Sequence, residues 1–283
     1  MFPTSSQIPH SVLFADDTSL LFRAADVRSA KESFDYYSSL LTEWFSLNKL
    51  YLNVSKSNII QFSPQTFRQH HIDYQLNNFT LHSLQNTKFL GIFIQNNLKW
   101  NSHIDNLCKK LSSSIYALRQ LSSVGTSNVL RSAYYGIFEP LLSYGVIFWG
   151  FTSQQNLDRV FVLQKRALRI VWGLGRADSC REHFGTDRIL TVPALIIYFS
   201  VIYIFQNQQR FQNVSHHMNT RNHSHLISPN FNLEICRKSV FFQGPIMFNK
   251  LPIQIKQSPS LKIFKRRLKD YLSHRVLYSL SEL

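Results

Sequence analysis

The sequence predicts an α+β fold, in which short strands and one long helix precede a mainly helical region. Up to residue 95, short apolar runs alternate with turn-forming residues, whereas from Trp100 onward apolar residues recur at helical spacing. The charge changes at the same place: residues 1–90 carry seven basic and seven acidic side chains, and residues 91–283 carry 24 and nine. A boundary near residues 96–100 is therefore expected.

A short apolar run at 12–14 and a second run of strand-forming character at 18–22 flank Ala15-Asp16-Asp17, which has turn chemistry. This order predicts a β-hairpin. Asp26 is the expected N-cap of a long helix whose apolar residues continue to Leu47. Further strands are expected at 58–62, 79–84 and 88–94, the last two forming a pair.

Beyond the boundary, the periodicity predicts helices at about 102–122, 127–143, 154–172, 189–209 and 260–274. The apolar run 189–205 stops short of the roughly 20 residues of a membrane span, so a buried core helix is favoured. Loops and short strands are expected over 211–259. The histidines there, together with Cys236, lack the spacing of a zinc finger, so loop histidines are favoured over a metal site; they are His216, His217, His223 and His225.

Composition restricts the class of protein. With 283 residues, of which 44% are hydrophobic, the chain is long enough to bury a core, which excludes a mainly disordered protein. The formal net charge of +15 indicates a polyanionic partner, either nucleic acid or an anionic membrane surface. Three cysteines in no close pair support no disulfide framework, so a reducing, intracellular location is expected.

Asp16 and Asp17 stand at the expected hairpin tip. Neighbouring side chains on a strand point to opposite faces, whereas at a tight turn both carboxylates can face one point, where a divalent cation neutralises them. Oxygen ligands of this kind suit Mg²⁺. The alternative is an ordinary solvated turn, because Asp favours turns in any case.

Phe14-Ala15-Asp16-Asp17 resembles the aromatic-x-Asp-Asp motif of the reverse transcriptases of non-LTR retrotransposons. Further blocks are similar to those of jockey-like elements and keep their order. They comprise Leu-Asn-x-x-Lys at 52–56, Phe-Leu-Gly at 89–91, and the segments 98–104, 138–145, 149–150, 163–169, 220–222 and 248–252. The resemblance thus spans nearly the whole chain.

The resemblance implies a partial polymerase palm over 1–95, a helical thumb-like region over 96–185 and a C-terminal helical and loop region over 186–283. It implies that Asp16 binds catalytic Mg²⁺ with Asp17 in support, and that Lys56 neutralises the departing pyrophosphate. Phe14 and Gly91 are implied to be structural residues of their motifs. Two-metal transfer would join a primer 3′-hydroxyl to the α-phosphate of a deoxynucleotide.

The family's remaining metal carboxylate and its fingers lie upstream of this hairpin, and residues 1–15 contain no acidic residue. The chain is therefore interpreted as a fragment of an RNA-directed DNA polymerase, inactive or nearly so without the missing N-terminal half. The implied partners are RNA template, RNA–DNA duplex and, in the intact enzyme, deoxynucleotides. No membrane partner is expected, and the expected location is the nucleus and cytoplasm. The alternative is a basic nucleic-acid-binding module that performs no chemistry.

Two amphipathic helices carry the expected nucleic-acid surface, together with Lys99. In 154–172 a basic stripe lies opposite an apolar face and comprises Arg159, Lys165, Arg166 and Arg169. The last helix repeats the pattern with Lys262, Lys265, Arg266 and Lys269. The alternatives are solvated charged faces and, since basic amphipathic helices suit anionic lipids, a membrane surface.

Overall fold

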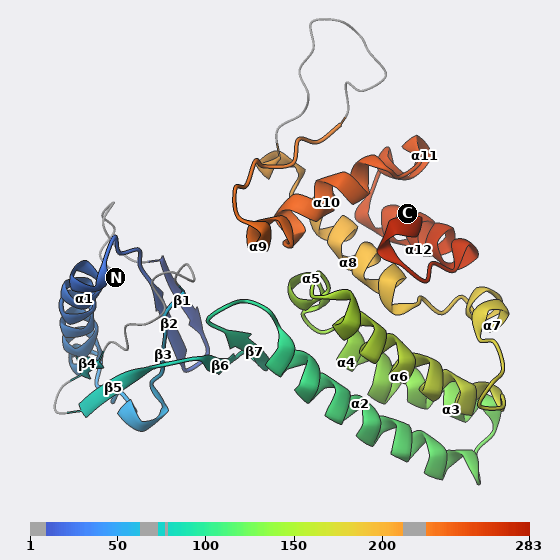
Figure 1. The fold of residues 1–283 in the computed structure, drawn as a ribbon, viewed down its shortest axis with the longest axis horizontal. Helices are drawn as coiled ribbons and strands as arrows, with labels where there is room; N and C mark the ends of the chain where they lie inside the picture. The colour runs from blue at the N-terminus through green and yellow to red at the C-terminus, as the bar shows by residue number, and fades with distance from the viewer. Residues whose placement is uncertain (1–9, 63–72, 77–78, 212–224) are drawn as a thin grey trace, which may run out of the picture. The chain divides into compact units, whose positions relative to one another are not determined.

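The computed structural model describes residues 10–62, 73–76, 79–211 and 225–283. The chain forms two compact units, Met1–Asn97 and Leu98–Leu283, which we call the N-terminal and C-terminal units (Figure 1). The fold is α+β, with the described strands in the N-terminal unit and most helices in the C-terminal unit. The division into palm, thumb and C-terminal region stays a prediction.

The N-terminal unit opens with the predicted hairpin. Strands β1 (His10–Phe14) and β2 (Asp17–Leu21) are antiparallel, and Phe14 pairs with Asp17. Ala15 and Asp16 alone form the turn, so Asp17 is already the first residue of β2. Ala15 has a φ of 53°, in the left-handed region that a two-residue hairpin turn requires of at least one residue. The hairpin therefore forms at the predicted place.

Helix α1 (Val27–Leu47) begins at Asp26, as predicted. The Asp26 carboxylate accepts a hydrogen bond from the Ser29 amide at 2.7 Å, and the Ser29 hydroxyl accepts one from the Asp26 amide at 3.1 Å. Hydrogen bonding of the Asp26 carboxylate by Ser29, chiefly by its backbone amide, lowers the pKa of Asp26. Phe34 of α1 packs on Tyr74, with ring centroids 4.7 Å apart, and so joins the helix to strand β4 (Asp73–Leu76).

The remaining strands differ from the prediction in their number and pairing. Strand β5 (Phe79–Leu84) pairs with β4 and with β3 (Ile59–Ile60), whereas β6 (Asn86–Phe89) and β7 (Ile92–Gln95) form a separate hairpin. The single strand expected at 88–94, and its pairing with 79–84, is therefore wrong. Leu90 and Gly91 form the turn with φ values of 45° and 82°. Two consecutive positive φ values suit a two-residue hairpin, and Gly91 adopts one without steric cost.

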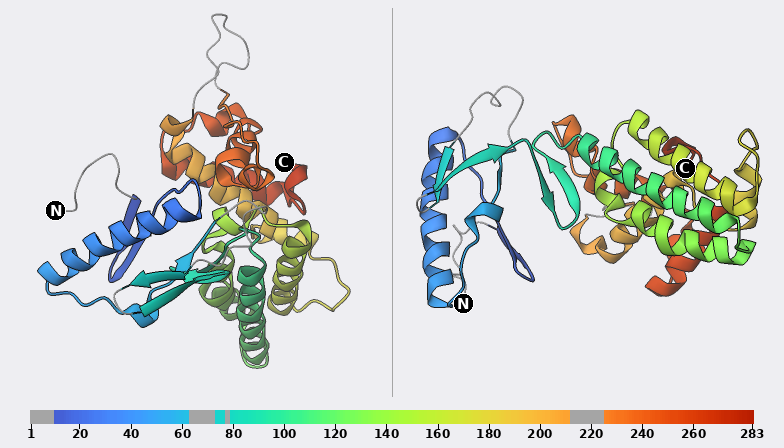
Figure 2. Two further views of the ribbon diagram at one scale, coloured as in Figure 1. Left: turned by 60° about the vertical axis from the view of Figure 1, so that its left-hand side comes forward. Right: turned by 90° about the horizontal axis from the view of Figure 1, so that it is seen from below.

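The C-terminal unit is built on helices α2 (Asn101–Ser122) and α6 (Gln154–Trp172), which lie side by side (Figures 1 and 2). The segment predicted as a helix at 127–143 contains α3 (Ser127–Ala133), a π-helical turn (Tyr134–Phe138) and α4 (Glu139–Ser143). Short helices α5 (Val146–Trp149) and α7 (Arg181–Thr186) flank α6 in the sequence. Helix α12 (Leu261–Arg275) lies where the last helix is predicted.

The expectation of loops and short strands over 211–259 is wrong for much of the described part. Helices α9 (Glu234–Arg237), α10 (Val240–Asn249) and α11 (Ile253–Lys256) form there. Helix α10 packs closely on α8 (Val192–Gln206): a Cβ added at Gly244 would lie 2.7 Å from the Ile204 side chain. Packing against α8 thus stabilises α10, a helix that the local sequence, with Pro245 inside it, does not indicate.

Helix α8 is the predicted core helix, shorter than expected. It is apolar on most sides, and ten of its 15 residues are buried. No helix in the described part of the chain combines the length and apolarity that crossing a membrane requires. Thr191 caps α8 by accepting a hydrogen bond from the Ala194 amide at 3.2 Å.

The side-chain amide of Gln164 joins three segments of the C-terminal unit. Gln164 has no exposed surface. It donates hydrogen bonds to the Tyr134 hydroxyl at 3.0 Å and the Leu190 carbonyl at 2.9 Å, and it accepts one from the Val192 amide at 2.9 Å. Helix α6 is thereby fixed to the π-helical turn and to the start of α8.

We expect Gln164→Leu to lower the free energy of unfolding by about 2–5 kcal/mol, because it leaves buried partners unsatisfied. Urea unfolding followed by tryptophan fluorescence measures this loss. The matched control is Gln155→Leu, on the exposed side of the same helix. Equal losses of unfolding free energy in the two variants would contradict a stabilising role for the Gln164 hydrogen bonds.

Candidate functional site

The two carboxylates of the hairpin tip are exposed. Asp16 lies in the turn, and Asp17 begins β2 opposite Phe14, whose side chain is 61% exposed. No hydrogen bond or ion pair joins either carboxylate to another residue in the described ranges. The tight turn places two adjacent anionic groups at one end of the hairpin, open to a ligand from solvent.

The carboxylates of Asp16 and Asp17 only partly meet the needs of the Mg²⁺ centre that the resemblance implies. Carboxylate oxygens are suitable Mg²⁺ ligands, and one ion is commonly held by one or two carboxylates with waters and phosphates. A centre of two ions needs further ligands. Within the described ranges, no three His, Cys, Asp or Glu side chains form a group that could hold a metal ion. These residues alone therefore do not form a two-ion centre.

Lys56 lies in a single 3₁₀ turn (Val54–Lys56) of the N-terminal unit and is exposed. Asn53 organises this turn: its side-chain oxygen accepts from the Ser55 hydroxyl at 2.7 Å, and its carbonyl accepts from the Ser57 hydroxyl at 3.0 Å. The Leu-Asn-x-x-Lys block thus contains a structural asparagine and a lysine whose ammonium is open to solvent. Gly91, in the Phe-Leu-Gly block, lies in the β6–β7 turn.

The predicted basic stripe of α6 is divided between two sides of the helix. Arg159 donates to Asp105 of α2 at 2.6 Å, whereas the Lys165 ammonium lies 4.7 Å from the Phe161 ring centroid and 5.8 Å from that of Tyr278. Arg169 donates to the Asp178 carbonyl at 3.0 Å. Arg166 is exposed and has no hydrogen bond or ion pair to the residues that the structure describes. Three of the four cations therefore already make intramolecular contacts.

The basic side chains of the α12 stripe have fewer intramolecular contacts than those of the α6 stripe. Its four cations are exposed and make no hydrogen bond or ion pair within the described parts of the chain; they are Lys262, Lys265, Arg266 and Lys269. Phe264, Leu268 and Leu272 are buried on the other side of the helix. Lys99 is exposed, and its carbonyl accepts a hydrogen bond from the Thr152 hydroxyl at 3.1 Å.

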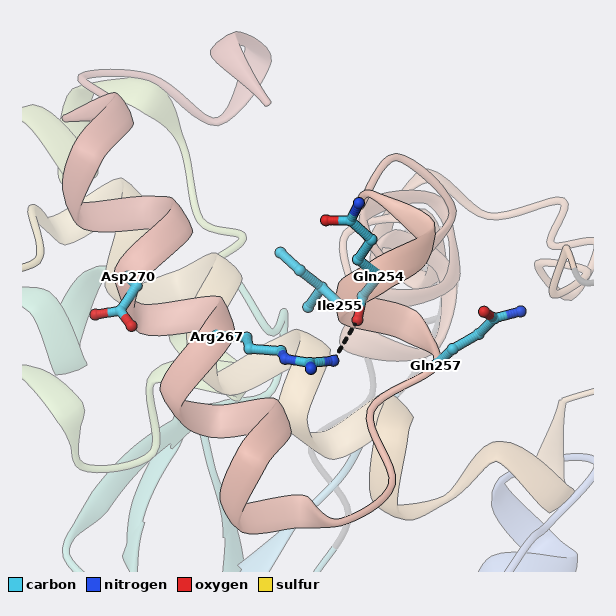
Figure 3. Close-up of a pocket in the computed structure, with 5 residues that line it drawn as sticks. All are labelled: Gln254, Ile255, Gln257, Arg267 and Asp270. Atoms are coloured by element: carbon cyan, nitrogen blue, oxygen red, sulfur yellow. Dashed lines mark hydrogen bonds between the residues drawn. The ribbon is translucent and has the colours of Figure 1, made fainter.

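A polar pocket of about 490 Å³ lies between α11 and α12, lined by Gln254, Ile255, Gln257, Arg267 and Asp270 (Figure 3). Arg267 donates to the Gln254 carbonyl at 2.8 Å, and Asp270 accepts from Arg188 at 3.3 Å. The charged groups of the pocket thus have intramolecular partners, and they stabilise the junction of the two helices.

Two blocks that carry the resemblance, 98–104 and 149–150, contact each other in the C-terminal unit, and the block 248–252 anchors a neighbouring segment. The His103 ring lies 6.3 Å from Trp100 and 6.1 Å from Trp149, between centroids. Asn249 accepts from the Leu226 amide and donates to the Leu226 carbonyl, both at 2.9 Å, and so anchors an irregular segment to α10. These structural roles, like that of Gln164, were not predicted from the sequence. The sequence carries no clear signal for them, because their blocks contain other polar or charged residues as well.

Some predicted features lie outside the described residues, namely the block at 220–222 and His216, His217 and His223. His225 and Cys236 are described, and within those limits neither belongs to a group that could hold a metal ion. All three cysteines are free thiols.

Two curated proteins of Drosophila melanogaster are similar to this chain. The probable RNA-directed DNA polymerase from transposon BS is 26% identical over 161 residues, which are 56% of this chain and 18% of that protein. The RNA-directed DNA polymerase from mobile element jockey is 24% identical over 187 residues, 64% of this chain and 20% of that protein. The aligned region is thus about a fifth of the length of each relative. No protein-family model and no solved structure matches.

These two matches confirm the resemblance to jockey-like reverse transcriptases that the motifs indicate. Both relatives are RNA-directed DNA polymerases by name. The roles of individual residues stay predictions.

We expect the C-terminal unit to lose stability in acid through His103. Burial, and to a smaller extent Lys110, lowers the pKa of this imidazole from 6.5 to about 4. Between these values the unfolded chain binds a proton that the folded chain does not, so stability is full above pH 6.5 and falls towards pH 4, by about 3 kcal/mol. Urea unfolding at several pH values, compared with His103→Phe, measures this term. The same pH dependence in both proteins would contradict it.

Proposed function

We propose that this chain is part of an RNA-directed DNA polymerase of a non-LTR retrotransposon. The N-terminal unit would contribute part of the palm, and the C-terminal unit the thumb and the region that follows it. The observation that carries the proposal is an aromatic-x-Asp-Asp motif at a hairpin tip in a chain similar to two RNA-directed DNA polymerases. A nuclear and cytoplasmic location is part of this proposal.

In this proposal Asp16 and Asp17 hold Mg²⁺, and Lys56 neutralises the departing pyrophosphate. The exposure of both carboxylates and the lack of a competing partner among the described residues support a ligand role. Bound Mg²⁺ would stabilise the charge that develops on phosphate oxygens. The further carboxylate that a two-ion centre needs would come from outside the described residues.

The apolar surface of the N-terminal unit supports a further packing partner. Val12, Leu13 and Phe14 of β1 are 43%, 52% and 61% exposed. Among the described residues of this unit, the buried apolar side chains are those of Ala30, Tyr74 and Leu76. Apolar side chains exposed together on one strand commonly mark a surface that another segment covers. We propose that this segment is the preceding part of the polymerase.

The C-terminal unit would bind the RNA template and the RNA–DNA duplex. Residues 91–283 carry 24 basic side chains against nine acidic ones. Five of these nine acidic side chains lie in ion pairs within the unit, so their charges are already balanced locally. The open cations of α12 and Arg166 are then free to contact phosphates.

Primer extension on an RNA template tests the polymerase proposal. We expect no extension by the chain alone. When the preceding part of the jockey polymerase is supplied as a separate polypeptide, we expect extension that Asp16→Asn reduces by about a thousandfold or more, as losses of metal and charge stabilisation do.

The matched control is Asp35→Asn, an exposed aspartate on α1 of the same unit, which should retain extension. Extension that survives Asp16→Asn would exclude the proposed metal site. Binding of duplex without extension in any mixture would instead favour the non-catalytic binding module.

The nucleic-acid surface has its own test. Replacing Lys262, Lys265, Arg266 and Lys269 together with glutamine should weaken duplex binding and reduce the slope of log affinity against log salt by about 0.9 for each phosphate that the variant no longer neutralises. The control is the same change of charge at four exposed cations of the N-terminal unit: Arg23, Lys31, Lys49 and Lys88. An equal effect of the two sets would contradict a specific role of α12.

A further inference from the structure

The outward face of α2 carries an exposed aromatic ring between cations. Tyr116 is 63% exposed and makes no hydrogen bond or ring contact with the described residues. At 3.6 residues per turn, Lys109 and Arg119 lie within about 60° of Tyr116 around the helix axis. The side chains of both are exposed, and the Lys109 ammonium and Arg119 guanidinium make no hydrogen bond or ion pair with any residue in the described ranges.

The residues between these groups are small or already bonded to their own helix. The hydroxyls of Ser112 and Ser113 donate to the carbonyls of Cys108 and Lys109, at 2.8 and 3.2 Å. Their short side chains leave the ring and the two cations prominent on this face. From residue 106 to the end of α2 the sequence contains no acidic residue. Asp105, near the start of the helix, is already paired with Arg159.

Helix α6 adds another cation beside this face. Asn101 accepts from Asn156 at 2.8 Å, and Asp105, one turn later, accepts from Arg159, so α2 and α6 run parallel. Seven residues further along both helices, Ser112 of α2 is level with Arg166 of α6. Arg166, the α6 stripe residue without an intramolecular partner in the described structure, thus lies on the side of α6 nearest this face.

We propose that Tyr116, flanked by Lys109, Arg119 and Arg166, is a binding surface for single-stranded nucleic acid, on which an unpaired base stacks. The proposal rests on the proposed nucleic-acid partner of the C-terminal unit and adds a surface distinct from the α12 stripe. The cations complement a phosphate backbone. The exposed ring favours a single strand over a duplex, because the bases of a duplex are stacked on one another and offer no free face.

Anisotropy of a fluorescein-labelled oligothymidylate and of a DNA duplex, each titrated with the full chain, tests this surface. We expect Tyr116→Ala to weaken binding of the single strand about 10- to 100-fold, while the salt dependence and duplex binding change little. Tyr116→Phe, which keeps the ring, should bind as the unsubstituted chain does. Lys109→Gln and Arg119→Gln should each reduce the salt slope by about 0.7.

The control for exposure is Tyr36→Ala, an exposed tyrosine of the N-terminal unit with a similar exposed fraction, 61%. If Tyr116→Ala binds the single strand as Tyr36→Ala does, the stacking surface is excluded while nucleic-acid binding by the unit stands. If Tyr116→Ala weakens single strand and duplex equally, selectivity for unpaired bases is excluded. If the full chain binds neither probe, the proposal that the C-terminal unit binds nucleic acid is excluded.

Discussion

The buried amide of Gln164 is the interaction on which the arrangement of the C-terminal unit depends. Its three hydrogen bonds orient α6 against the π-helical turn and the start of α8. Once this face of α6 points into the core, the directions of the four basic side chains on the helix are fixed. Arg159 reaches α2, Lys165 and Arg169 reach Tyr278 and Asp178, and Arg166 points to solvent. Gln164 and the other buried residues of α6 thus together decide which cations of the helix remain open to a ligand.

Tertiary contacts such as those of Gln164 also determine which parts of the fold can be predicted from the sequence. Local signals predicted the correct elements where they were strong: the Asp26 cap of α1, the turn between β1 and β2, and the amphipathic helices α2, α6 and α12. Local signals gave wrong predictions where contacts between distant segments determine the secondary structure. Helices α9 to α11 lie in a segment without clear periodicity, and at least α10 depends on its packing against α8. The Leu90-Gly91 turn interrupts an apolar run that reads locally as one strand.

The candidate site likewise has one part that the local sequence predicts and another that depends on tertiary contacts. The hairpin tip is a local structure, so the position of Asp16 and Asp17 could be predicted from turn chemistry. The α6 stripe could not, because a helical wheel shows which side chains share a face but not which of them meet Asp105, Tyr278 or Asp178 from elsewhere in the chain. The surface at Tyr116 likewise depends on the parallel packing of α2 and α6, which no local pattern indicates.

In the function that we propose, the hairpin tip holds a divalent cation shared with phosphate. Line broadening of backbone amide signals by Mn²⁺, in the presence of primer–template and a deoxynucleotide, tests it most directly. We expect broadening concentrated on the amides of Ala15 to Thr18. Broadening of these signals no stronger than that of amides near other exposed aspartates, such as Asp35 and Asp73, would contradict it.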